Sequence, residues 1–370
     1  MKEVYVGLDV HRKKTVYVIQ GSDGDVVAEG STPTHREGIQ QIALKHELEP
    51  GTQVCLECGV QAGMVCDALE EIEMVPVVVD AAEVRKKARR RGQKTDRRDA
   101  FEICDGLRRG IWASIVYMPP PPVRRLRRIL SRRRHFVRLG TQQINAAKFL
   151  LRAEGILTEE SISLTTEAAW SKLTARSETE ALRGHLELHA KTWDLALKHT
   201  GLLEKELRAA LEPFAEIMGW LTSVPGIGLV TAASFIAVVG DPSRFPDSNH
   251  LVSYLGLAPS MFDSGDAERH GHITKAGPPY MRALLCEIAQ QASRPRHPLH
   301  PYFVRVAAKS GYKKAAIAIA QRLARIMYRM WLNREGFDVS KLNVERDGKA
   351  RTKIYHWKIR QPAKALAAAS

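Results

Sequence analysis

Within the first 80 positions, segments with the apolar pattern of strands are followed by and interspersed with segments that have the pattern of helices. The order of these segments restricts the possible folds of this chain more than any other feature. Residues 4–10 alternate with a period of two and predict a strand, because successive side chains of a strand point to opposite faces. Further strands are expected at 15–20, 25–30, 53–58 and 75–80, and helices at 36–47 and 62–73. The order strand, strand, strand, helix, strand, helix, strand predicts an α/β domain with a mixed sheet.

The rest of the chain has helical periodicity, and four consecutive prolines at 119–122 separate it from the first domain. Proline is excluded from helix interiors, so we place a domain boundary there. One apolar stripe is formed by Leu182, Leu186, His189, Trp193 and Leu197, and Leu203, Leu207 and Leu211 prolong it. This stripe fits a core-facing helix and an intermolecular coiled coil, and both remain open. We expect domains at 1–118, 119–220 and 221–340, a long helix at 313–332 and a basic tail at 341–370.

The charge balance favours a polyanionic partner. The 370 residues carry 56 Lys and Arg against 41 Asp and Glu, a formal net charge of +15, and nucleic acid is the commonest polyanion. No segment reaches the roughly 18 apolar residues that a membrane-spanning helix needs, and the start leaves no room for a signal peptide. The five cysteines are too few for a disulfide framework. We therefore expect a reducing compartment, the prokaryotic cytoplasm beside the nucleoid, and take Cys55 and Cys58 as buried strand residues.

Four carboxylates are candidate metal ligands. Asp9 and Glu57 each lie on the strand face opposite the aliphatic side chains. The element order is that of an RNase H-like domain, in which the first and fourth strands are neighbours, so these two carboxylates can meet. Asp96 and Asp99 share one face if a helix begins there. Clustered carboxylates repel one another unless cations lie among them, and two Mg²⁺ ions roughly 4 Å apart would also assist phosphoryl transfer.

The two aspartates at 96 and 99 have an alternative interpretation, in which Asp96 is the N-cap of the helix and Asp99 is a first-turn residue favoured by the helix dipole. The basic segment from residue 85 to residue 98 also has an alternative interpretation: a run of charged residues is usually a solvated surface. Its position beside the acidic set favours contact with nucleic-acid phosphates. The candidate contacts there are Arg89, Arg90, Arg91 and Lys94.

The C-terminal half carries a second group of candidates. Residues 223–232 have a Pro and two glycines, Gly226 and Gly228, in the pattern of a helix-hairpin-helix loop that exposes backbone amides to phosphate. A helix–helix turn packed on protein is the alternative. Ser264, before a glycine, is by itself most often a turn residue. Cations that could contact a scissile phosphate are Arg269, Lys275 and Arg282.

Taken together, these motifs resemble the DEDD-type insertion-sequence transposases, serine recombinases whose relatives use a structured bridge RNA. The resemblance runs from residue 4 to about residue 332. It rests on Gly7-Leu8-Asp9, Glu57, Lys94-Thr95-Asp96 with Asp99-Ala100, Val224-Pro225-Gly226-Ile227-Gly228, Phe262 with Ser264-Gly265, and Thr274-Lys275 with Gly277. Two positions depart from the family pattern: Cys58-Gly59-Val60-Gln61 follows Glu57, and Thr274 stands where Ser is commoner.

The resemblance implies an α/β RNase H-like (RuvC-like) N-terminal domain, a mostly helical, coiled-coil middle segment for assembly, and a helical C-terminal transposase domain. It also implies that Asp9, Glu57, Asp96 and Asp99 bind Mg²⁺ and that Ser264 attacks a DNA phosphate and stays covalently linked. The implied partners are element-end and target DNA, a structured guide RNA and further copies of the chain, as a dimer or tetramer. A RuvC-like junction nuclease that ignores Ser264 and a non-catalytic helix-hairpin-helix binding protein remain alternatives.

Overall fold

The computed structural model describes residues 3–87, 95–156, 162–177, 179–264 and 267–342, with the backbone alone for residues 87, 261–264 and 267–270. The chain forms two compact units, Met1–Met118 and Pro119–Ser370. Of the segments named from the sequence, the basic residues Arg89, Arg90, Arg91 and Lys94 and the tail from 343 onward lie outside the described residues.

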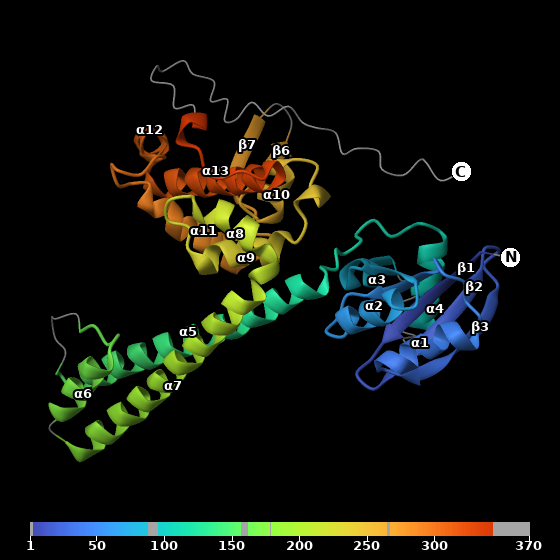
Figure 1. Cartoon of the computed structure of the whole chain (residues 1–370), viewed down its shortest axis with the longest axis horizontal. Coiled ribbons are helices and arrows are strands. Elements are labelled where there is room, and N and C mark those ends of the chain that lie inside the picture. The colour runs from blue at the N-terminus through green and yellow to red at the C-terminus, as the bar shows by residue number, and fades with distance from the viewer. Residues whose placement is uncertain (1–2, 88–94, 157–161, 178, 265–266, 343–370) are drawn as a thin grey trace. The chain divides into compact units, whose positions relative to one another are not determined.

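The first unit is a five-stranded mixed sheet with helices on both faces (Figure 1). Its elements are β1 (Val4–Val10), β2 (Lys14–Gly21), β3 (Val26–Pro33), α1 (Arg36–Lys45), β4 (Gln53–Glu57), α2 (Ala62–Glu70), β5 (Val75–Val79), α3 (Ala81–Lys87) and α4 (Asp96–Arg108). The strand order is β3-β2-β1-β4-β5, antiparallel from β3 to β1 and parallel from β1 to β5. The predicted element order and the pairing of the first strand with the fourth are confirmed.

The two faces of the sheet are covered by different helices. Val6, Leu8, Val54 and Leu56 pack with α1 and α2 in one core cluster. On the opposite face Tyr5, Val16 and Val18 pack with Ala100 and Cys104 of α4. The alternation of β1 therefore directs Asp9 to the α4 face, away from the aliphatic core. Cys55 is buried on that face, but Cys58 is exposed because β4 ends at Glu57, so the prediction of a buried Cys58 is wrong.

The second unit begins with a long arm of two helices, α5 (Pro121–Ala153) and α7 (Glu180–Ala210), with the short α6 (Glu167–Ala175) at its tip (Figure 1). Leu126 and Ile129 of α5 pack with Leu207 near the base of the arm. Near its tip Ala147 and Leu151 of α5 pack with Leu182, Leu186, Trp170 and Trp193, so the helices are antiparallel.

The leucine stripe of α7 is thus covered by α5 of the same chain, as expected for a core-facing helix. Leu197 is an exception: it is 53% exposed, because Ala196 is the residue that α7 buries against α5 at this level, and the prediction of Leu197 as part of the stripe is wrong. Two of the four prolines, Pro121 and Pro122, form the first turn of α5, where a missing N–H costs no hydrogen bond.

The remainder of the second unit is mostly helical. Its elements are η1 (Glu212–Phe214), α8 (Ala215–Thr222), α9 (Leu229–Val239), η2 (Pro242–Arg244), α10 (Ser248–Tyr254), β6 (Pro259–Ser264), β7 (Ala267–Ile273), α11 (Pro279–Gln291), α12 (His300–Ser310), α13 (Tyr312–Asn333) and η3 (Val339–Lys341). Helix α13 is the predicted long helix, and Leu323, Ile326 and Met327 are fully buried in the core. The antiparallel β6–β7 hairpin is an addition to the all-helical domain predicted from the sequence. No helix in the described residues is long and apolar enough to cross a membrane.

Candidate metal centre

Close packing of α4 on β1 positions the acidic residues. A Cβ on Gly7 would lie 2.3 Å from the Ala100 carbonyl oxygen and 2.5 Å from the Cys104 nitrogen, so only glycine allows this approach. The Cys104 thiol donates a hydrogen bond of 3.1 Å to the Tyr5 carbonyl on the same strand. These contacts bring the first turn of α4 to the end of β1 that carries Asp9.

Gly7→Ala should therefore loosen this packing, because the atoms that a new Cβ meets belong largely to the backbone of α4. We expect the first unit to lose about 1–3 kcal/mol of unfolding free energy, the usual cost of overpacking. Urea denaturation checks this, with Gly59→Ala as the control, since a Cβ there meets nothing closer than the Glu57 carbonyl oxygen at 4.0 Å. Equal unfolding free energies for the two variants would show that Gly7 does not set the approach of α4.

The first turn of α4 presents Asp96 to solvent beside the strand. Thr95 is the N-cap, and its hydroxyl accepts a hydrogen bond from the Arg98 amide. Asp96 is therefore the first helical residue and not the cap. Capping by Thr95 leaves the Asp96 carboxylate, 55% exposed, available for another partner.

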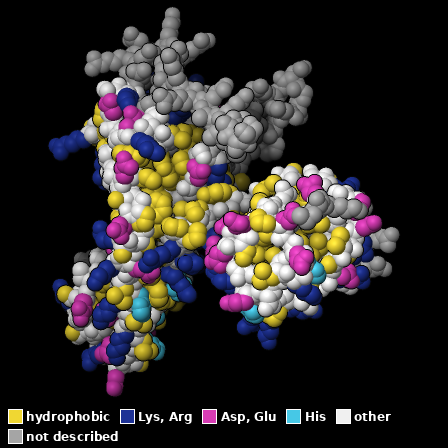
Figure 2. Space-filling view, turned by 45° about the vertical axis from the view of Figure 1, so that its right-hand side comes forward, with side chains coloured by type: hydrophobic (Ala, Val, Ile, Leu, Met, Phe, Trp, Pro, Cys, Tyr) yellow, Lys and Arg dark blue, Asp and Glu magenta, His cyan; other side chains and the backbone are white. Residues whose placement is uncertain are grey.

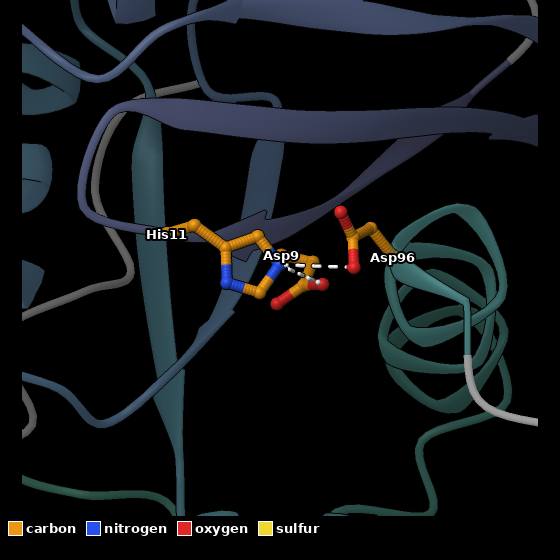
Figure 3. Close-up of side chains that lie close together, drawn as sticks. All are labelled: Asp9, His11 and Asp96. Atoms are coloured by element: carbon orange, nitrogen blue, oxygen red, sulfur yellow. Dashed lines mark ion pairs between the residues drawn. The ribbon is translucent and has the colours of Figure 1, made fainter.

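Three side chains meet at this end of β1: Asp9, His11 and Asp96 (Figure 3). One ligand atom from each lies within 4.8 Å of the other two. Nε2 of His11 is 2.9 Å from Oδ2 of Asp9 and 3.3 Å from Oδ1 of Asp96. A carboxylate pair with an imidazole is a ligand set that binds divalent metal ions.

The environment of Asp9 opposes its negative charge. Burial raises the pKa of its carboxyl most strongly, the charge of His11 lowers it, and the carboxylates of Asp99 and Asp96 raise it again. Among the described residues, none donates a well-aligned hydrogen bond to the buried Oδ2 of Asp9. A half-buried carboxylate of this kind gains stability from a cation placed against it.

Glu57 and Asp99 lie nearby but outside this group of three. β1 and β4 are parallel with Leu8 opposite Leu56, so Asp9 and Glu57 are the next residues in register on the same face. Asp99 lies one turn after Asp96 and close enough for its charge to raise the pKa of Asp9. Neither belongs to the set of ligand atoms within 4.8 Å, so the structure brings together two of the four predicted carboxylates at that spacing.

His11 was not predicted as a site residue. The signal was present in the sequence, since a residue two positions after Asp9 points to the same side of an extended chain.

The C-terminal candidates lie in the second unit. Gly226 has a φ of +87° in the turn between α8 and α9, and a Cβ there would meet Gln291 and Ile288 of α11, so this side of the turn packs on protein. Gly228 is the N-cap of α9. Ser264 ends β6, where its backbone pairs with Ala267, and Arg269 lies in β7; both side chains lie outside the described residues.

Lys275 lies in the loop after β7, and Arg282 lies in the first turn of α11. Nη1 of Arg282 donates hydrogen bonds to the carbonyl oxygens of Leu255 (3.1 Å), Gly277 and Ala276. Lys275 is exposed with a φ of +56°, and its amide donates to the Gly256 carbonyl. Arg282 thus holds in place the loop that carries Lys275.

Comparisons with known proteins identify relatives of this chain. Residues 6–154 match an IS110-type DEDD model described as Transposase, and residues 218–304 match the model described as Transposase IS116/IS110/IS902 family. The putative transposase y4qE of Sinorhizobium fredii is 27% identical over 303 residues, 78% of this chain and 71% of that protein. The transposase for insertion sequence element IS1111A of Coxiella burnetii is 26% identical over 262 residues, 67% of this chain and 69% of that protein. A pilin gene-inverting protein of Moraxella lacunata is 34% identical over 121 residues, 32% of this chain and 38% of that protein.

An α/β domain with an acidic site, followed by a helical unit with these matches, defines a DEDD transposase, a class of enzyme that cuts and rejoins DNA and typically depends on divalent metal. The chain belongs to the IS110/IS116 family of transposases.

Proposed function

We propose that this transposase cuts and rejoins DNA with a metal-assisted acidic site in its first unit and a serine nucleophile in its second. The observation that carries the proposal is the meeting of Asp9 and Asp96, from a strand and a helix 87 positions apart, within a segment that matches DEDD transposases. The strand order β3-β2-β1-β4-β5 supports an RNase H-like, RuvC-like assignment for this unit.

The residues present fit a divalent cation. The buried Oδ2 of Asp9 lacks an aligned donor among the described residues, and Asp96 supplies a second, more exposed carboxylate beside it. We assign Asp9 and Asp96 as its ligands, with Glu57 and Asp99 completing the acidic set. Mg²⁺, which binds carboxylates while keeping several waters, would supply Lewis-acid assistance to phosphoryl transfer when bound. The half-buried Asp9 fixes the ligand position, and the exposed Asp96 leaves room for a phosphodiester.

Ser264 is proposed as the nucleophile, on the strength of the motif match around it. Its Oγ would form a bond to a DNA phosphorus while the bond from that phosphorus to the departing sugar oxygen breaks. The sugar leaves as a hydroxyl, taking up the proton that the serine loses, and the reverse reaction rejoins the strand. Ser264 is the last residue of β6. Guidance by a structured RNA and assembly of several copies follow from the family resemblance.

The arginines of α5 are proposed as part of the DNA-contacting surface. Arg128, Arg132 and Arg138 are exposed, and within the described chain no ion pair engages them. Lys and Arg side chains are spread along the α5–α7 arm in Figure 2. In contrast, Arg133 is paired with Glu204 at 2.6 Å. Unpaired guanidinium groups along one helix are suited to a phosphate backbone.

Replacing Arg128, Arg132 and Arg138 together with Ala should weaken non-specific binding to duplex DNA and flatten its salt dependence. Each lost phosphate contact removes about 0.9 from the slope of log K against log salt, so we expect a decrease of about 2–3. Fluorescence anisotropy at several salt concentrations measures it. Lys198→Ala is the matched control, because Lys198 is already paired with Asp194 on α7 at 2.6 Å. If the slope of log K against log salt were unchanged in the triple variant, these three arginines would be excluded from DNA contact.

The overall proposal is tested by incubating the purified protein and its co-purified RNA with labelled element-end DNA, with and without a divalent metal. Metal-dependent strand cleavage that is lost in Asp96→Ala supports the acidic site. Cleavage that continues unchanged in Asp96→Ala, or in the presence of a chelator, would exclude it.

A further inference from the structure

His11 is placed as a ligand would be placed, although it is not one of the four carboxylates. It follows β1 directly, and its Nε2 atom is turned toward both Asp9 and Asp96 (Figure 3). The side chain is 45% exposed, so it is free to turn elsewhere in solvent. Its position between two carboxylates therefore needs a reason.

His11 makes two short contacts with carboxylates. Nε2 of His11 lies 2.9 Å from Oδ2 of Asp9 and 3.3 Å from Oδ1 of Asp96. One imidazole carries at most one positive charge, so two carboxylates beside it leave an excess of negative charge at this end of β1. A divalent cation among the three side chains would balance that charge.

The spacings match those of ligands around one ion. Atoms about 2.1 Å from a divalent cation lie about 3.0 Å apart when adjacent in an octahedron and about 3.4 Å apart in a tetrahedron. The Nε2 atom of His11 is 2.9 Å and 3.3 Å from the two carboxylate oxygens. Both distances are those of adjacent ligands of one cation, and the two carboxylate oxygens lie within 4.8 Å of each other.

We propose that His11 is a metal ligand of this transposase and that it makes the acidic site bind Mn²⁺ in preference to Mg²⁺. The inference rests on the proposed function, because it assumes that Asp9 and Asp96 hold a metal ion. Mg²⁺ takes oxygen ligands and sheds its waters reluctantly, so it gains little from an imidazole. Carboxylates accept Mg²⁺, Ca²⁺ and Mn²⁺ alike, and of these Mn²⁺ is the transition-metal ion, for which a nitrogen donor adds affinity. With Mg²⁺ the carboxylates act alone; with Mn²⁺ the imidazole joins them.

The exposed side of the group remains open for the rest of the coordination shell. Asp9 is 14% exposed and forms the floor, whereas His11 and Asp96 are about half exposed and form the rim. Three protein ligands leave positions for water and for phosphate oxygens. This arrangement suits a site that must admit a nucleic-acid strand.

Metal titration of the full-length protein tests the inference without any DNA. Isothermal titration calorimetry gives the dissociation constants of Mn²⁺ and Mg²⁺ for the wild type, His11→Ala and His11→Gln. Glutamine offers a neutral oxygen at a similar reach, so it keeps the side-chain length while removing the nitrogen ligand. We expect the ratio of Mn²⁺ to Mg²⁺ affinity to fall by about 10-fold or more in both variants, with Mg²⁺ binding nearly unchanged. Pulsed electron paramagnetic resonance of bound Mn²⁺ should show coupling to an imidazole nitrogen in the wild type and none in His11→Ala.

The outcomes separate this inference from the proposed function. An unchanged affinity ratio, or no nitrogen coupling in the wild type, overturns the ligand role of His11. If Asp96→Ala still abolishes metal binding in that case, the carboxylate site stands and His11 is only its counter-ion. If the wild type binds neither ion, both the inference and the metal site of the proposed function are overturned.

Discussion

Asp9→Asn is expected to lower the rate of metal-dependent strand cleavage by about 10²–10³-fold while leaving DNA affinity within about twofold. Asp9 is 14% exposed, against 55% for Asp96, so its charge acts on a cation with little screening by water. Asparagine keeps its shape but removes that charge. Single-turnover cleavage of labelled element-end DNA on a denaturing gel, with binding measured separately by anisotropy, gives both quantities.

A suitable control is Asp25→Asn, which removes an exposed carboxylate from the β2–β3 turn of the same unit. The control should cleave DNA at the wild-type rate. If the two variants were equally active, the acidic group would have no part in the chemistry. If Asp9→Asn lost DNA binding as well as cleavage, the residue would have a structural role instead.

Ser264→Ala should reduce transposition by about 10³-fold or more, because no other group replaces a lost covalent nucleophile. Excision of a marked element in cells, followed by quantitative amplification of the rejoined donor site, measures this. Ser260→Ala is the matched control on the same strand: its hydroxyl donates to the His272 carbonyl at 2.9 Å and has no proposed chemical role. Transposition at wild-type frequency in Ser264→Ala would leave the first unit to act alone, as in a nuclease.

Sequence patterns predicted the first unit well because its elements are simple. Strict alternation in residues 4–10 gave both the strand and the face on which Asp9 lies, and the structure confirms each. The pairing of β1 with β4 brings Glu57 into register with Asp9, as the element order predicted. Helix α13 was equally clear, since its apolar residues recur over 22 residues.

Other features depend on contacts that no local pattern encodes. Thr95, and not Asp96, caps α4, although either residue type can cap a helix. Cys58 is exposed because β4 ends one residue earlier than its apolar character suggested. The β6–β7 hairpin carries His270 and Arg269 at positions where a strand has little apolar signal. His11 joins the acidic group through a tertiary approach of α4 that Gly7 permits.

The central claim, that one reaction uses both the acidic site and Ser264, is tested most directly by trapping a covalent intermediate. Purified protein, divalent metal, co-purified RNA and labelled element-end DNA are combined and resolved on a denaturing gel beside Ser264→Ala and Asp9→Asn. We predict a protein–DNA adduct that requires the metal, appears with the wild type and is absent from both variants. Cleaved DNA with no adduct in the wild type would contradict the claim and indicate a nuclease that works through the carboxylates alone.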